Sequence, residues 1–264
     1  MQMIELNGIT MHISDQGDPS GTPVVFSNSL GTDFRLWDQI VPLLPKGLRI
    51  IRYDMRGHGL TSCPEGDYFM GDLVGDVAAL LDHLQIRNCV FVGLSIGGMI
   101  AQGLAAERPD LLRAMVLSNT AAKIGTVDMW HERIAAVRAG GVSALSEPIL
   151  ERWFSSRFRT ENKTELEGWR NMLCRTPRDG YCGCSAAISE TDLFDSTARL
   201  SLPTLGIAGS EDGSTPPDVV RETVELIAGA RFHLIRQAGH LPCVEQPDEF
   251  AAVLTDFLQE VGHV

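Results

Sequence analysis

Short apolar runs alternate along the chain with stretches whose apolar residues recur at helical spacing. Cys89–Leu94 is nearly continuous in apolar residues, as expected for a strand buried on both faces. Between residues 70 and 84 the apolar positions fall on one face of a helix. Similar patterns predict strands at 9–14, 23–27, 48–53, 115–117, 204–208 and 232–235, and helices from the end of 89–94 to about 106, at 218–227 and at 247–261. This alternation predicts an α/β fold with a mostly parallel twisted sheet and helices on both faces.

The strand series is interrupted between residues 123 and 199. This stretch has mostly helical patterns and contains three of the four tryptophans. It carries 11 Lys+Arg and 11 Asp+Glu, so the whole formal charge of −12 lies outside it. We therefore predict a core made of residues 1–122 and 200–264, with 123–199 inserted as a helical lid.

The composition, with 44% hydrophobic and 21% charged residues, is that of an ordinary globular protein. A net charge of −12 disfavours general attraction to nucleic acid or to an anionic membrane, although local cations can still bind a small anion. No apolar run approaches the roughly 20 residues that span a bilayer. Residues 1–13 lack the basic start and apolar stretch of a secretory signal, so we expect a cytoplasmic protein.

The six cysteines are expected to be reduced thiols, because a chain of this length does not depend on a disulfide framework. Cys182-Gly-Cys184 lacks the two-residue gap of common zinc and thioredoxin motifs. We interpret these two cysteines as packing residues and predict no metal site.

The strongest local signal is Gly93-Leu94-Ser95-Ile96-Gly97, between the buried strand and the helix that follows it. Gly-x-Ser-x-Gly in this context is typical of a turn that holds a serine hydroxyl above the sheet edge, at the positive end of a helix. The pattern also occurs in ordinary turns. The flanking strand and helix favour Ser95 as a nucleophile.

A serine hydroxyl needs a base to accept its proton. Among seven histidines, His240 is the best candidate, because it lies in a loop after the last predicted strand. His58 also follows a strand, but its neighbouring glycines fit a tight turn, so contact with substrate is the lesser interpretation. The other histidines fit a helix face, strands, the lid or the chain end: His83, His12, His233, His131 and His263.

The base in turn needs an acid to orient it, and Asp212 follows the predicted strand at 204–208. Glu211 is the adjacent competitor and fits a solvated position better. The strand that ends near residue 117 is followed by Ser118-Asn119-Thr120, so no carboxylate stands at that alternative place.

A tetrahedral oxyanion needs prearranged N–H donors. We predict the amide of Ile96, directly after the nucleophile, and the amide of Leu30, in the loop Asn28-Ser29-Leu30-Gly31 after the strand at 23–27. The alternative is that this loop only makes a turn.

These motifs together resemble the α/β-hydrolase superfamily over nearly the whole chain. The matching segments are the Ser95 turn, Asp54-Met-Arg56-Gly-His-Gly59, the acid loop 209–216 and the histidine loop 239–247, and the order Ser, Asp, His is that of the superfamily. Most relatives have His-Gly where this chain has Asn28-Ser29. Residues 26–33 with Trp37, and the lid segment 176–188, are similar to the 3-oxoadipate enol-lactonases of bacterial aromatic catabolism.

The resemblance implies an activity without a metal or organic cofactor, in which Ser95 attacks a lactone carbonyl, His240 moves the proton and Asp212 stabilises the imidazolium. Such a small lactone carries a carboxylate, so we expect lid cations to bind it, with Arg133, Arg152 and Arg175 as candidates. Trp130, Trp153 and Tyr181 are candidate apolar walls. The alternative is that the arginines lie on solvated helix faces and that the aromatic residues fill the lid core.

Other functions on the same scaffold remain open. They are a carboxylesterase, a carbon–carbon bond hydrolase, a cofactor-free perhydrolase and, with less support, a binding protein that has lost catalysis. A dehalogenase or epoxide hydrolase is disfavoured, because those relatives need an aspartate where this chain has Ser95. The sequence leaves the oligomeric state open.

Overall fold

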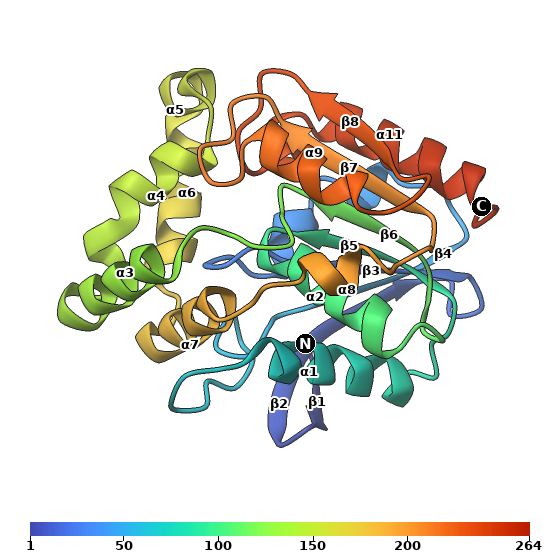
Figure 1. Cartoon of the computed structure of the whole chain (residues 1–264), viewed down its shortest axis with the longest axis horizontal. Coiled ribbons are helices and arrows are strands. Elements are labelled where there is room, and N and C mark those ends of the chain that lie inside the picture. Colours follow the sequence, from blue (N-terminus) through green and yellow to red (C-terminus); the bar gives the residue numbers. More distant parts are fainter.

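The fold is that of a computed structural model describing residues 1–264. Eight strands form one sheet in the order β1-β2-β4-β3-β5-β6-β7-β8 (Figure 1). Their bounds are β1 Gln2–Leu6, β2 Ile9–Gly17, β3 Thr22–Ser27, β4 Leu48–Tyr53, β5 Cys89–Leu94, β6 Leu112–Ser118, β7 Thr204–Gly209 and β8 Arg231–Ile235. β2 pairs antiparallel with β1 and β4, and all other pairs are parallel. The carboxyl ends of β3 to β8 therefore meet at one edge, where ligands of parallel sheets bind.

Every predicted strand is present, and one strand was missed. β1 lies at the sheet edge with exposed or half-exposed side chains, so its sequence lacks the apolar run that marks β5. β5 is buried along its whole length, in agreement with its near-continuous apolar sequence.

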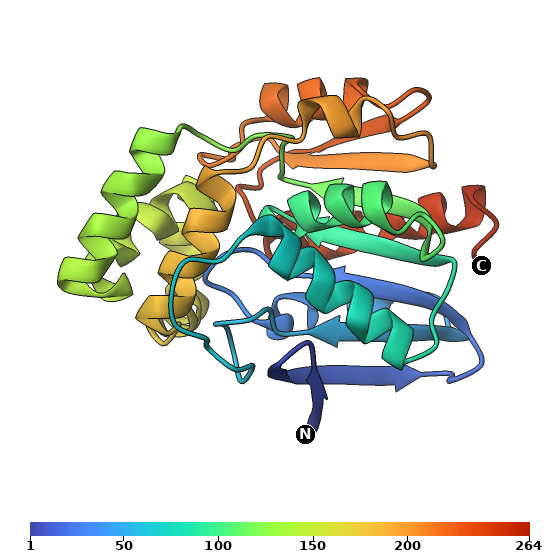
Figure 2. The ribbon, with the colours of Figure 1, turned by 60° about the horizontal axis from the view of Figure 1, so that its bottom comes forward.

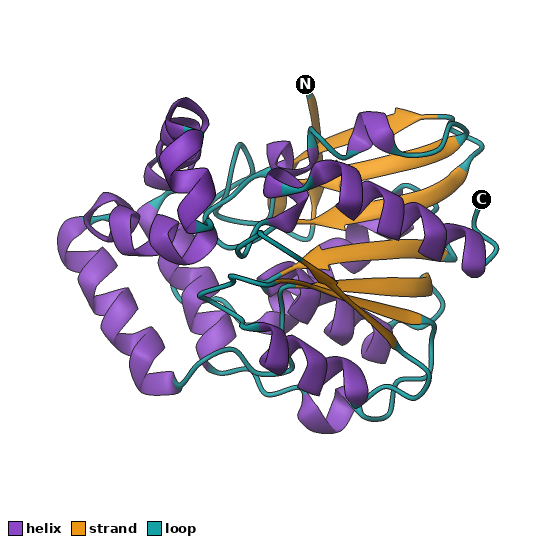
Figure 3. Cartoon of the chain, turned by 90° about the horizontal axis from the view of Figure 1, so that it is seen from above, coloured by secondary structure: helices purple, strands orange, loops and turns teal.

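Helices cover both faces of the sheet (Figure 3). Those outside the lid are α1 Met70–His83, α2 Ile96–Glu107, α9 Pro217–Glu225, α10 Pro242–Glu245 and α11 Pro247–Glu260, with 3-10 turns η1 Phe34–Trp37 and η2 Val41–Leu43. The predicted helices at 70–84, after 94, at 218–227 and at 247–261 correspond to α1, α2, α9 and α11. No helix is long and apolar enough to cross a membrane.

Residues 123–199, which we call the lid, contain no strand. Their elements are α3 Val127–Gly140, η3 Val142–Leu145, α4 Ser146–Trp153, α5 Ser156–Glu161, α6 Lys163–Cys174, α7 Arg178–Ser189 and α8 Phe194–Thr197. Helices α3 to α7 gather beyond the carboxyl edge of the sheet, on the left in Figures 1 and 2. Buried side chains of the lid, such as Phe154 and Leu173, belong to the same continuous core as the strands. The lid is therefore packed onto the sheet edge rather than built around a separate core.

Candidate active site

Ser95 occupies the sharp turn between β5 and α2, with φ 58° and ψ −120°. The residues two positions before and after it must be glycines, because a Cβ on Gly93 would lie 2.2 Å from the carbonyl oxygen of Gly97, and a Cβ on Gly97 would lie 2.5 Å from that of Ser27. The backbone of Ser95 is held by hydrogen bonds with Ser118 and Thr120 on the neighbouring strand end. A strained, over-determined turn of this kind fixes the direction of one side chain, here the Ser95 hydroxyl.

Asp212 and His240 form a buried pair at the ends of β7 and β8. The distance between His240 Nδ1 and Asp212 Oδ2 is 2.9 Å. Burial alone would raise the pKa of Asp212, but the charge of His240 and hydrogen bonds from His240, Asn119 and the Ser214 amide together lower it. The carboxylate is therefore ionised at neutral pH and holds the proton on Nδ1, which leaves Nε2 of His240 as the acceptor.

Two further side chains hold Asp212, and neither was predicted from the sequence as part of the site. Asn119 Nδ2 and Thr215 Oγ1 each donate to Asp212 Oδ2 over 2.8 Å. Asn119 follows β6 with a positive φ of 47°, a conformation that asparagine tolerates better than most residues. The signal in the sequence is therefore an asparagine directly after a strand, at a position where the chain has no carboxylate.

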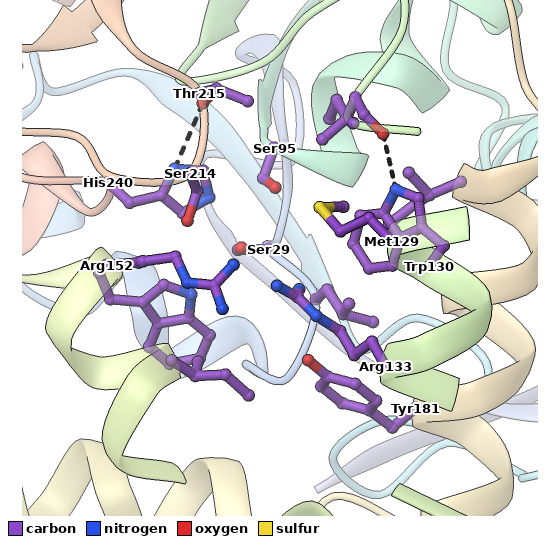
Figure 4. A pocket seen from close by; sticks show the side chains of 16 residues that line it. Ser29, Ser95, Met129, Trp130, Arg133, Arg152, Tyr181, Ser214, Thr215 and His240 are labelled. Atoms are coloured by element: carbon purple, nitrogen blue, oxygen red, sulfur yellow. Dashed lines mark hydrogen bonds between the residues drawn. The ribbon is translucent and has the colours of Figure 1, made fainter. Parts of the chain in front are cut away.

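Ser95 and His240 line one pocket between the sheet edge and the lid (Figure 4). No hydrogen bond joins the Ser95 hydroxyl to His240 in this structure, and the bond that orients the ring is the one between His240 Nδ1 and Asp212. The pocket also contains Ser29 and Leu30 from the loop after β3, and Ser214 and Thr215 from the acid loop. Three strand-end loops and the lid thus enclose the serine and the histidine together.

The backbone amides of Leu30 and Ile96 donate to no other group of the protein. The loop that carries Leu30 is fixed through Asn28, whose side chain accepts from Trp37 Nε1 at 2.9 Å and donates to the carbonyl of Tyr53 at 2.7 Å. Asn28 is the first of the two residues, Asn28-Ser29, that depart from the superfamily pattern. Here it anchors the loop and leaves the Leu30 amide free to bind an oxyanion.

Comparisons with known proteins agree with this geometry. The sequence pattern of the Alpha/beta hydrolase family matches residues 24–253. This chain belongs to the α/β-hydrolase family. A curated relative, 3-oxoadipate enol-lactonase 2 of Acinetobacter baylyi, is 34% identical over 242 residues, which are 92% of this chain and 90% of that protein.

Two solved structures are similar over nearly their full lengths. The enol-lactonase from Burkholderia xenovorans LB400 superposes with a TM-score of 0.95 at 35% identity, over 98% of this chain and all of that one. A thermophilic esterase from Thermogutta terrifontis, solved with malate bound, has a TM-score of 0.94 at 26% identity and full coverage of both chains. The predicted α/β-hydrolase fold and the resemblance to enol-lactonases are confirmed, and this α/β-hydrolase is a hydrolytic enzyme.

His58 has a different place in this α/β-hydrolase from His240. It is fully buried outside the pocket, and its Nε2 accepts the N–H of Gly31 over 2.9 Å. Burial lowers the pKa of His58 to about 4, although its contact with the carbonyl of Arg56 opposes the shift. A neutral His58 therefore fixes the residue that follows Leu30, and its side chain does not line the pocket.

We expect a pH-dependent stability contribution from His58. Below pH 6.5, the ordinary pKa of histidine, the imidazole of the unfolded chain binds a proton that the folded site excludes. The free energy of unfolding therefore decreases as the pH is lowered, until the folded ring also binds a proton near pH 4. The difference in free energy of unfolding between the native protein and His58→Gln should therefore narrow by about 2 kcal/mol from pH 7 to pH 5. Urea unfolding at the two pH values measures it. A difference that does not change with pH would mean that His58 is not held neutral.

Five of the six predicted lid contacts line the pocket, and they are Trp130, Arg133, Arg152, Trp153 and Tyr181. Neither arginine has a carboxylate partner. The guanidinium of Arg133 lies 4.7 Å from the ring centre of Trp130, and burial and the charge of Arg133 both lower the pKa of Arg152. The two unneutralised cations face the same small space as Ser95 (Figure 4).

The prediction for Arg175 was wrong. This residue directly follows α6, is exposed, and lines a separate hollow with His12, Asp54 and Arg35. The geometry at the end of α6 turns it away from the pocket that contains Ser95, and helix periodicity in the sequence does not specify that turn. Trp169, the third lid tryptophan, packs against Phe154 in the lid interior, with 6.1 Å between the two ring centres.

The protein has no cluster of three or more His, Cys, Asp or Glu side chains that could hold a metal ion. All six cysteines are free thiols, and Cys182 and Cys184 are buried.

Proposed function

We propose that this hydrolase opens the lactone ring of 3-oxoadipate enol-lactone and gives 3-oxoadipate by way of an acyl-enzyme on Ser95. The observation that carries the proposal is the pair Arg133 and Arg152, which have no carboxylate partner in the pocket of Ser95. An acidic protein that keeps two such cations beside its serine is suited to a small substrate with a free carboxylate. The similarity to two enol-lactonases supports the same substrate class.

In the first half-reaction, Ser95 Oγ bonds to the lactone carbonyl carbon while Nε2 of His240 accepts its proton. The amides of Leu30 and Ile96 donate to the oxyanion, and Asp212 stabilises the imidazolium. Collapse of the tetrahedral intermediate breaks the ring C–O bond and releases an enol oxygen, which takes the proton from His240. Because the enol remains in the acyl chain and tautomerises to a ketone, ring closure becomes unfavourable.

In the second half-reaction, His240 takes a proton from water, and the hydroxide attacks the acyl carbon. Ser95 leaves with the proton from His240, and the dicarboxylate is released. Trp130, Trp153 and Tyr181 form apolar walls around the carbon chain, while the two arginines hold the carboxylate.

The second candidate is a carboxylesterase, which the similarity to the Thermogutta terrifontis esterase favours. Purified protein should be assayed with the enol-lactone and with a neutral p-nitrophenyl ester. If the protein is a lactonase, kcat/KM should be at least about 100-fold higher for the lactone than for the ester. This is the factor expected when hydrogen bonds from a charged arginine bind the substrate carboxylate. A higher kcat/KM for the neutral ester would favour the esterase.

Arg152→Met and Arg133→Met test the binding of the carboxylate. Each should raise KM for the lactone about tenfold or more, because each removes a charged hydrogen-bond donor from a partly buried site. KM for the neutral ester should change less than about twofold. Arg175→Met is the matched control, since Arg175 lies in a different hollow. An unchanged KM for the lactone in both variants and in their combination would contradict this role.

A further inference from the structure

Glu245 is a partly buried carboxylate outside the pocket, and it joins two separate parts of the site. It is the last residue of α10, five positions after His240. Its Oε1 accepts the N–H of Gly239 at 2.7 Å, and its two oxygens accept the N–H and the hydroxyl of Ser155 in the lid. No Lys, Arg or His side chain pairs with it. Four hydrogen bonds from two distant segments therefore converge on one carboxylate.

The lid segment next to Ser155 is bound directly to the loops of Asp212 and His240. The amide of His240 donates to the carbonyl of Trp153 at 2.8 Å, and the amide of Gly213 donates to the carbonyl of Arg152 at 3.2 Å. Gly239 passes so close that a Cβ would lie 2.5 Å from the oxygen of Trp153. The side chains of Arg152 and Trp153 line the pocket. Backbone hydrogen bonds therefore join the lid segment that lines the pocket to the loop that carries His240.

We propose that Glu245 is a positioning residue for the hydrolysis, because it fixes residues 152–155 of the lid in register with the loop that carries His240. It contacts neither the pocket nor the reacting atoms, and acts through Gly239 and Ser155. The proposal rests on the serine hydrolase chemistry given above, but not on which ester or lactone is the substrate.

The contacts explain why a carboxylate is needed here. Glutamine has nearly the same shape but only one acceptor oxygen. With that oxygen toward the N–H of Gly239, its NH₂ group would face Ser155, and the hydroxyl proton of Ser155 would lose the acceptor that Glu245 Oε2 provides. A buried donor left without an acceptor is unfavourable, so the two segments would move apart. Displacements of about 1 Å in a catalytic arrangement can lower rates by about 100-fold.

Glu245→Gln should therefore lower kcat for a neutral p-nitrophenyl ester by about tenfold or more and slow the labelling of Ser95 by a fluorophosphonate by a similar factor. KM for the ester should stay within about twofold, because no group that contacts the ester is removed. Glu249→Gln is the matched control: Glu249 is exposed on α11, pairs with His233 at 3.0 Å, and should leave both rates unchanged. A loss of packing alone would lower the melting temperature without this separation of kcat from KM.

Ser155→Ala removes the lid partner of Glu245, and it tests the proposal if Glu245→Gln does not fold. It removes the bond from Ser155 Oγ to Glu245 Oε2 and also the helix-capping bond from the N–H of Phe158. It should lower kcat by about threefold or more, and the effects of the two substitutions should be less than multiplicative because both break the contact between Ser155 Oγ and Glu245. A folded Glu245→Gln with kcat and labelling rate within about twofold of the native protein, or fully multiplicative effects, would overturn the proposal. If only the lactone assay fails while the ester results hold, the lactonase proposal is wrong and this one stands.

Discussion

Ser95→Ala is expected to lower kcat for the lactone by about 10⁵-fold or more. The substitution removes the oxygen that forms the acyl-enzyme, and no other hydroxyl is held in a comparable strained turn at the positive end of a helix. The residual rate should come from the amides of Leu30 and Ile96 and from substrate binding alone. Steady-state kinetics of the purified variant, with a melting curve to establish that it is folded, measures the effect.

Ser201→Ala is a suitable control for this substitution, because Ser201 is exposed on the connection to β7, away from the pocket. It should retain the native kcat. A Ser95→Ala variant that keeps more than about a tenth of the native kcat would show that Ser95 is not the nucleophile.

Asp212→Asn should lower kcat by about 10⁴-fold. The carboxylate of Asp212 accepts from His240 Nδ1 and also from Asn119, Ser214 and Thr215. An amide at this position would turn its NH₂ group toward His240 or toward those donors. The imidazole would then favour the tautomer with its proton on Nε2 and could no longer accept the proton of Ser95.

Glu211→Gln provides the matched control for Asp212→Asn. Glu211 is the adjacent residue, is exposed, and its side chain contacts neither His240 nor Asn119. Its kcat should stay within about twofold of the native value. If Glu211→Gln lost as much activity as Asp212→Asn, the orienting acid would be Glu211.

The sequence was informative where parallel-sheet geometry constrains position. Ser95, Asp212 and His240 follow β5, β7 and β8, and the carboxyl ends of parallel strands must meet at one edge. The same argument led to Leu30, which follows β3. Strand β1 was not predicted, because an edge strand with exposed side chains does not need the run of apolar residues that indicates a buried strand.

The lid could be predicted only in part, because helix periodicity gives the buried face of a helix but not how helices cross. Arg133 and Arg152 reach the pocket, while Arg175 turns into another hollow at the end of α6. Asn119 and Glu245 were not predicted as parts of the site, since their roles arise from contacts with residues more than 80 positions away. Such contacts exist only once the core and the lid have packed together.

The role of Ser95 as nucleophile is tested most directly by the reaction of the native protein with a fluorophosphonate, followed by intact mass measurement and peptide mapping. We expect one adduct per chain, located on Ser95, because His240 and Asp212 activate that hydroxyl alone. Saturating product should slow the labelling, since it occupies the same pocket. A folded protein that stays unmodified, or an adduct on a different residue, would contradict the proposed nucleophile and the mechanism built on it.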